Sequence, residues 1–195
     1  MTRFARLSSV LATAVVALCG WVALAGATIV KQLSVADMTR RADVIVQGTV
    51  VRQSAAWDEA HARIYTITEI QVAEALKGGA APGAIVAVRQ LGGVADGIVQ
   101  SIPGNARFAA AEEVLVFLDR DETLPWHYVI GMAQGKYTVS KAGGAAQVAP
   151  DVHDLAFVRP HVGGALTPVD ATPQMTAATA LGDFKRQIQS ALLAP

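Results

Sequence analysis

The chain is expected to fold as a mainly β domain, a small barrel or sandwich, with one short helix before it and one amphipathic helix after it. Six segments dense in β-branched residues lie within about a hundred residues, separated by turn signals, a density that favours a barrel or sandwich over β-α-β units. The composition agrees, because 52% hydrophobic and 16% charged residues are not the balance of a disordered chain. With 195 residues, one domain is expected, two at most.

Residues 1–27 have the pattern of a secretory signal peptide. Arg3 and Arg6 precede a charge-free apolar stretch from Leu7 to Leu24, and small residues then lead to a cleavage site after Ala27. We therefore expect export by a Sec-type route, to the periplasm or the medium, and no membrane attachment of the mature chain. The alternative is an uncleaved anchor, because an apolar run of about 20 residues is long enough to span a bilayer.

The single cysteine, Cys19, lies inside this apolar stretch. A lipidated cysteine would need a small residue before it, and Leu18 is not small. Cleavage would therefore leave a mature chain without thiols or disulfides, which must be stabilised by its core alone.

The mature chain begins with a helix and a strand. Residues 34–42 predict a short helix, capped by Ser34 with Asp37 at the third position of a capping box. Residues 43–53 are rich in valine and predict a strand. Gly48 interrupts this strand and indicates a bulge or a close backbone approach.

The next strand, residues 62–75, is long and its apolar residues change parity. Tyr65 and Ile67 share one face, whereas Ile70 and the valine after it share the other. One extra residue at a β-bulge near Thr68–Glu69 would return all of them to one buried face. A long, bent strand of this kind is what a small closed barrel requires.

The remaining strands follow at short intervals, except for one long irregular segment, residues 92–112, which is expected to have a function or to fold on itself. The predicted strands are residues 84–91, 113–119, 127–132 and 136–140.

The C-terminal part divides into an arm and a helix. Residues 141–175, rich in Ala, Gly, Pro and Thr, predict an irregular arm. Residues 176–193 predict an amphipathic helix, whose apolar stripe is expected to dock on the barrel. The stripe consists of Leu181, Phe184, Ile188 and Leu192.

The order of these segments resembles the netrin-like module, an OB-type barrel found in tissue inhibitors of metalloproteinases and in complement C-terminal domains. The resemblance rests on the words ADVIV, ALKG and EEVLVFL and on the closing pair YVIGMAQGKYTV. It implies that residues 28–140 form one OB-like barrel of five to six strands. The inhibitors chelate zinc through a mature N-terminal cysteine, which this chain lacks, so no inhibitory residue is carried over.

No motif for a catalytic, metal or cofactor site is legible. The four histidines form no HExxH or HxH pattern, and Ser101 lacks the GxSxG context of a hydrolase nucleophile. Asp119, Asp121 and Glu122 share one turn, which we interpret as a charged hairpin tip rather than as a calcium site. We therefore expect neither a cofactor nor a metal, and an enzyme is the least favoured hypothesis.

The charge balance argues against a nucleic-acid partner. The formal net charge is zero, with 16 basic and 16 acidic residues, so no basic excess exists to neutralise phosphates.

The favoured hypothesis is an exported, non-enzymatic binding module whose partner is a secreted or cell-envelope protein. Aromatic and charged residues in loops at a barrel rim suit such contacts. The candidate binding residues are Trp57 and Asp58 in the 54–61 loop and Arg107 and Phe108 in the long irregular segment. The alternative is an inhibitor of a secreted or periplasmic peptidase, acting through an exposed, rigid ridge near the mature N-terminus or the 92–110 loop.

Overall fold

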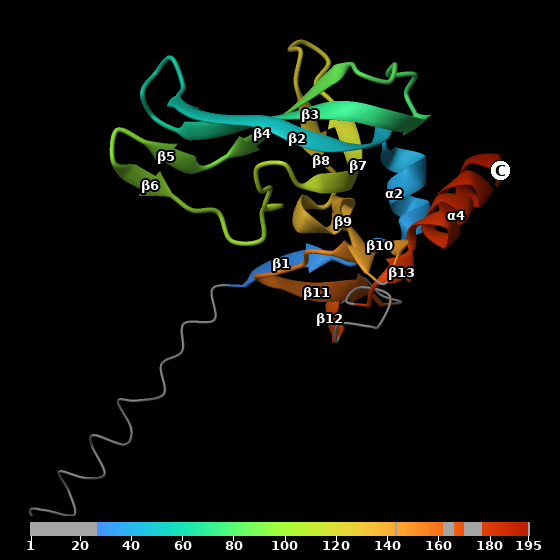
Figure 1. The fold of residues 1–195 in the computed structure, drawn as a ribbon. Coiled ribbons are helices and arrows are strands. Elements are labelled where there is room, and N and C mark those ends of the chain that lie inside the picture. Colours follow the sequence, from blue (N-terminus) through green and yellow to red (C-terminus); the bar gives the residue numbers. More distant parts are fainter. Residues whose placement is uncertain (1–26, 143, 162–165, 170–176, 195) are drawn as a thin grey trace, which may run out of the picture.

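The computed structural model describes residues 27–142, 144–161, 166–169 and 177–194 (Figure 1). The signal peptide expected at residues 1–27 lies, but for Ala27, outside the described residues. Among the described residues, no helix combines the length and the apolar character needed to cross a membrane.

The described chain is mostly strand, with two α-helices and a short 3-10 helix. In chain order the elements are β1 (Thr28–Lys31), α2 (Val35–Arg41), β2 (Val44–Trp57), β3 (Ile64–Lys77), β4 (Ile85–Leu91), β5 (Gly93–Ala95), β6 (Ile98–Gln100), β7 (Glu113–Arg120), β8 (His127–Val129), η1 (Met132–Gly135), β9 (Lys136–Ala142), β10 (Ala145–Pro150), β11 (Leu155–Pro160), β12 (Leu166–Val169), β13 (Thr179–Ala180) and α4 (Leu181–Leu193).

Five of these strands close into a barrel. β2 pairs antiparallel with β3 and with β7, and β3 pairs antiparallel with β4. β8 closes the ring, because it pairs in parallel with β4 and antiparallel with β7. The strand order β7-β2-β3-β4-β8, returning to β7, is that of an OB-type barrel, so the predicted fold class is confirmed.

β7 is buried on both faces and joins two hydrophobic cores. Its residues Val114, Val116 and Leu118 belong to the barrel interior. Leu115 and Phe117, on its other face, pack with residues of the two helices. This explains why the segment reads as a continuous apolar run instead of alternating with polar residues.

The parity change in β3 has a different cause from the one predicted. Ile64, Thr68, Ile70 and Val72 are buried, so these even-numbered residues face the barrel interior. Tyr65 and Ile67 are only half-buried and face outward. The pairing of β3 with β4 is continuous at Thr68–Glu69, and the nearest extra residue is Val51 of β2. The prediction that a bulge in β3 would bury Tyr65 and Ile67 is therefore wrong.

Gly48 marks both a bulge and a close backbone approach, as predicted. The pairing of β2 with β3 shifts register between Gln47 and Gly48. A Cβ atom at Gly48 would lie 2.3 Å from the carbonyl oxygen of Gln71. No side chain larger than hydrogen fits this crossing without backbone movement.

The prediction of an irregular arm over residues 141–175 is wrong for the described residues. β9 and β10 form a hairpin that extends the sheet beyond β7. β11 pairs with β12 and, in parallel, with β1 from the beginning of the described chain. β10, β11 and β12 are only four to six residues long, and β11 pairs with β1, which lies far earlier in the sequence. A local pattern therefore does not identify them.

Both predicted helices form. In α2, Ser34 Oγ accepts a hydrogen bond from the backbone N–H of Asp37 at 3.0 Å, and the predicted capping box is complete. α4 begins at Leu181 instead of residue 176, and it docks through Phe184 and Ile188, which are buried. Leu192 is 38% exposed, because the buried place on the last turn is taken by Ala191.

Candidate functional site

A groove of about 570 Å³ lies on the outer face of the barrel. Its floor comes from the outward residues of β2, β3 and β4, and its ends come from the loop after β2 and from the loop between β7 and β8. We call it the barrel-face groove. It is lined by Ser54, Ala56, Trp57, Asp58, Glu59, Ala60, Tyr65, Ile67, Arg89, Leu124 and Trp126.

Trp57 is held at one end of the groove by contacts from two segments. Its ring stacks on that of His61, with 4.8 Å between the centroids and 20° between the planes. Its indole Nε1 donates a hydrogen bond to Asp96, which lies in the β5–β6 hairpin, at 3.1 Å. The half-buried ring is therefore fixed in orientation before any partner arrives.

Asp58 shapes the loop that follows Trp57. Its carboxylate accepts hydrogen bonds from the backbone N–H groups of Ala62 and Arg63, at 2.7 and 3.1 Å. These two bonds lower the pKa of Asp58 from its ordinary value. The carboxylate therefore stabilises the turn as well as lining the groove.

Tyr65 and Arg89 form the middle of the groove. The guanidinium carbon of Arg89 lies 3.7 Å from the centroid of the Tyr65 ring, a cation–π contact. Ile67 pairs directly with Arg89 across β3 and β4, so the three side chains share one outer face. This patch offers a flat aromatic surface and a guanidinium, the side-chain types that dominate protein contacts.

The opposite end is formed by a rigid turn. Asp121 accepts hydrogen bonds from Thr123, from the backbone of Leu124 and from the Tyr128 hydroxyl. These bonds lower the pKa of Asp121 to about 2. The turn thereby presents Leu124, which is 45% exposed, and the half-buried Trp126 to the groove.

The candidate residues proposed from the sequence lie at two different sites. Trp57 and Asp58 line the barrel-face groove, whereas Arg107 and Phe108 line a second cavity of about 300 Å³. Arg107 is paired with Asp154 at 2.5 Å, and Phe108 packs partly buried against the barrel core. The structure does not bring the two pairs together.

The second cavity is largely a place where the 92–112 segment is tied to the barrel. Gln90 Nε2 donates to the carbonyl of Ala106, and Asn105 Nδ2 donates to the carbonyl of Leu91. These two amides tie the segment to the barrel through bonds to the backbone.

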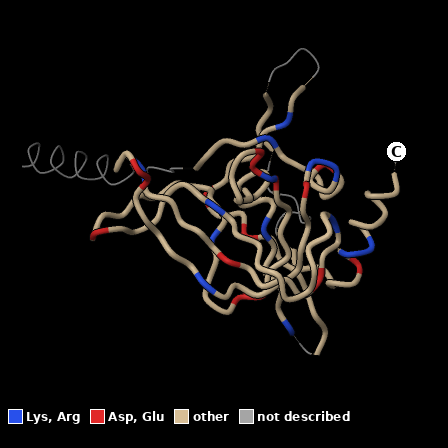
Figure 2. Tube along the Cα trace, turned by 90° about the horizontal axis from the view of Figure 1, so that it is seen from above, with Lys and Arg blue, Asp and Glu red and all other residues tan. Residues whose placement is uncertain are grey.

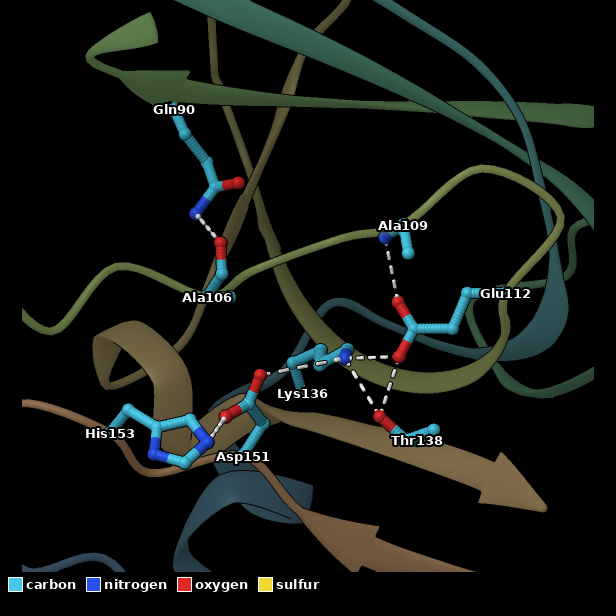
Figure 3. Close-up of polar contacts among 8 residues, drawn as sticks. All are labelled: Gln90, Ala106, Ala109, Glu112, Lys136, Thr138, Asp151 and His153. Carbon is cyan, nitrogen blue, oxygen red and sulfur yellow. Dashed lines mark hydrogen bonds and ion pairs between the residues drawn. The ribbon is translucent and has the colours of Figure 1, made fainter. Parts of the chain in front are cut away.

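A buried ionic cluster holds the end of the same segment (Figure 3). The Lys136 ammonium, on a side chain only 2% exposed, lies 2.5 Å from Glu112 Oε1 and 2.8 Å from Thr138 Oγ1. Asp151 lies 3.9 Å away on the other side and is also paired with His153. Each charge in the cluster has a partner, and Lys136 lines none of the cavities found among the described residues. We therefore interpret the cluster as structural.

The candidate set of binding residues omitted the groove residues Tyr65, Ile67, Arg89, Leu124 and Trp126. The available signal was the parity change in β3, which places two apolar side chains outside the barrel. An alternation that breaks over Tyr65 and Ile67 indicates an exposed apolar patch as readily as a bulge.

No metal site is assembled in the described part of the chain. No group of three or more His, Cys, Asp or Glu side chains there is arranged to hold a metal ion. In the turn with Asp119 and Glu122, the Asp121 oxygens are occupied by internal hydrogen bonds.

The groove lies on the outer face of a closed five-stranded barrel with the strand order of an OB fold. In OB barrels, ligands bind across the second and third strands and the two flanking loops, and the groove occupies this position on β3, β4 and the loops at its ends. No family model, no curated protein and no solved structure matches the chain. The resemblance to netrin-like modules therefore stays a prediction, and function has to be argued from the site.

Proposed function

We propose that this protein is an exported, non-enzymatic binding module that holds an extended segment of a secreted or cell-envelope protein in the barrel-face groove. The observation that carries the proposal is the set of Trp57, Tyr65, Arg89 and Trp126 on one preorganised outer face. Trp, Tyr and Arg supply most of the binding energy in protein interfaces. Strands and a hydrogen-bonded turn fix these side chains, so little ordering entropy is lost on binding.

The charge distribution supports a protein partner over nucleic acid. Acidic and basic residues are interspersed along the described trace (Figure 2). Asp58 and Glu59 line the groove together with Arg89. A phosphate backbone would be repelled by the two carboxylates and attracted by only one cation.

The test is capture of partners by the immobilised mature protein from culture supernatant and envelope extract. Trp126→Ala and Tyr65→Ala are each expected to weaken capture at least about ten-fold. Truncating a central aromatic residue in an interface typically costs about 2 kcal/mol or more of binding free energy. Melting temperatures of the variants should stay close to that of the parent, since both rings lie outside the barrel core.

The matched control is Val99→Ala. Val99 is 70% exposed on the β5–β6 hairpin and does not line the groove. It should leave capture unchanged. Equal capture by the parent and by both groove variants would refute the proposal.

Peptidase inhibition is the second candidate function, and one feature favours it. The β5–β6 hairpin carries three exposed apolar side chains, Val94, Ile98 and Val99, with 58%, 53% and 70% exposure. An exposed ridge of this kind is what the inhibitor hypothesis requires near the 92–110 loop. Capture of a peptidase that is lost in Val99→Asp, and kept in Trp126→Ala, would favour inhibition over the groove-binding function.

A further inference from the structure

A third cavity, of about 380 Å³ and more enclosed than the other two, lies between the helices, the β9–β10 hairpin and the small sheet of β1 and β11. We call it the inner cavity. It shares no residue with the barrel-face groove. Its lining residues are Gln32, Leu33, Ser34, Val35, Met38, Gln134, Tyr137, Pro150, Val152, Phe157, Arg159 and Gln187.

Most of the inner cavity wall is apolar. Leu33, Val35, Met38, Val152 and Phe157 contribute aliphatic or aromatic surface, and the volume is within the range of small-molecule sites. The polar side chain of Gln134 is already used, since it accepts from the N–H of Leu33 and donates to the carbonyl of Lys31. The wall therefore suits an apolar chain or ring.

The Tyr137 hydroxyl is a further polar group on this wall. Tyr137 is 5% exposed, and its ring packs against Phe184 and Phe117, with centroids 4.5 and 5.9 Å away. No hydrogen bond joins its hydroxyl to another described residue, and the hydroxyl is not among the buried atoms left without a partner, so it is open to the space of the cavity. A phenol hydroxyl in this position can donate a hydrogen bond to a ligand.

The guanidinium of Arg159 lies where the inner cavity meets a smaller neighbouring cavity. Arg159 lines both, and the neighbouring cavity also contains Lys31 and Asp37. Arg159 Nε donates to the side chain of Gln32, which orients the guanidinium, while its terminal nitrogens have no partner among the described residues. Asp37 is occupied by Ser34 and Arg40, so it does not neutralise Arg159.

We propose that the inner cavity binds a small amphipathic carboxylate, with its apolar chain against the wall and its carboxylate on the guanidinium of Arg159. The wall supplies the hydrophobic contact, and the free guanidinium nitrogens match the two oxygens of a carboxylate. The Tyr137 hydroxyl donates to an oxygen of the ligand where that end of the chain carries one. This site is separate from the proposed partner groove, and either proposal can fail without the other.

The experiment is calorimetric titration of the purified chain with sodium decanoate, with decanol and butanoate as probes of the two halves of the ligand. Decanoate is expected to bind with a stoichiometry of one, and both decanol and butanoate at least about ten-fold more weakly, because each lacks one half of the interaction. Equal binding of decanol would overturn the role of Arg159, and no saturable decanoate binding would overturn the site.

Variants locate the binding. Arg159→Gln should weaken decanoate about ten-fold or more and leave decanol unchanged, whereas the matched Arg52→Gln, on the outer barrel surface, should change neither. Val152→Trp should fill the inner cavity and weaken both ligands. Decanoate binding that survives in Val152→Trp, with a melting temperature like that of the parent, would place it elsewhere and refute the proposal.

Discussion

At the residue scale, the buried ion pair between Lys136 and Glu112 governs how the long 92–112 segment is attached. The side chains are 2% and 14% exposed, so both charges have lost most of their water. The Glu112 carboxylate also accepts hydrogen bonds from the N–H of Ala109 and from the hydroxyl of Thr138, so both of its oxygens are bonded. A pair with this many hydrogen bonds holds the segment in one position, although its net stabilisation is small compared with the cost of breaking it.

The same ion pair makes the free energy of unfolding depend on pH. Burial alone would raise the pKa of Glu112, but hydrogen bonds from Lys136, Thr138 and Ala109 outweigh it and lower the pKa below 4.5. The unfolded chain therefore takes up a proton first as the pH falls. The stabilisation from Glu112 is complete above a pH of about 4.5 and is lost as the pH falls through the lower pKa of the folded state.

We expect Glu112→Gln to lower the free energy of unfolding at neutral pH and to flatten its decrease between about pH 5 and pH 3. Denaturant unfolding at a series of pH values measures this slope. Glu59→Gln, an exposed carboxylate in the loop after β2, is the control and should keep the slope of the parent. An identical slope in Glu112→Gln would show that other carboxyl groups control acid unfolding.

At the scale of elements, α4 is part of the core. Phe184 is 4% exposed and contacts Tyr137 and Phe117 through tilted and edge-on ring geometries. Lys185 on the same helix pairs with Glu74 of β3 at 2.5 Å, a half-exposed contact that adds little. Apolar burial therefore provides most of the attachment.

We expect Phe184→Ala to reduce the free energy of unfolding by about 3–5 kcal/mol, the usual cost of truncating a buried phenylalanine. Leu193→Ala, at a position that is 86% exposed on the same helix, should change it by less than about 0.5 kcal/mol. Thermal or chemical unfolding followed by circular dichroism separates the two. If both variants unfolded like the parent, the helix would not be docked in solution.

At the scale of the whole molecule, the predicted cleavage of a signal peptide would set where the N-terminal strand begins. Thr28 begins β1, where its N–H donates to the carbonyl of Asp154 at 2.9 Å and its hydroxyl donates to Pro103 at 2.6 Å. Cleavage after Ala27 would keep all of β1 and its parallel pairing with β11.

We expect the exported protein to begin at Thr28. Intact-mass measurement on protein recovered from the exported fraction tests this, and a mass that includes residues 1–27 would support the anchor alternative. A start several residues later would remove β1 and should expose the β11 edge, which lowers the melting temperature.

Local pattern was sufficient where neighbours in sequence decide the structure. The capping box of α2, the apolar stripe that continues through Phe184 and Ile188, and the dense apolar run of β7 are all local signals, and each predicted its element. Gly48 also indicated the close approach of β2 and β3. These features depend on side-chain type and period alone.

The amino-acid sequence by itself determined the mainly β class, the two helices, the barrel strands and the aromatic residues that could form a site. Only the tertiary structure decided which face of β3 is buried. It also decided that Trp57 lies with Tyr65 and Trp126 but apart from Phe108, and that β11 pairs with β1. The physical reason is that alternating side chains along a strand define its two faces, but the alternation does not determine which face is buried. Coverage and long-range pairing depend on closure of the barrel, which brings together residues that no local period relates.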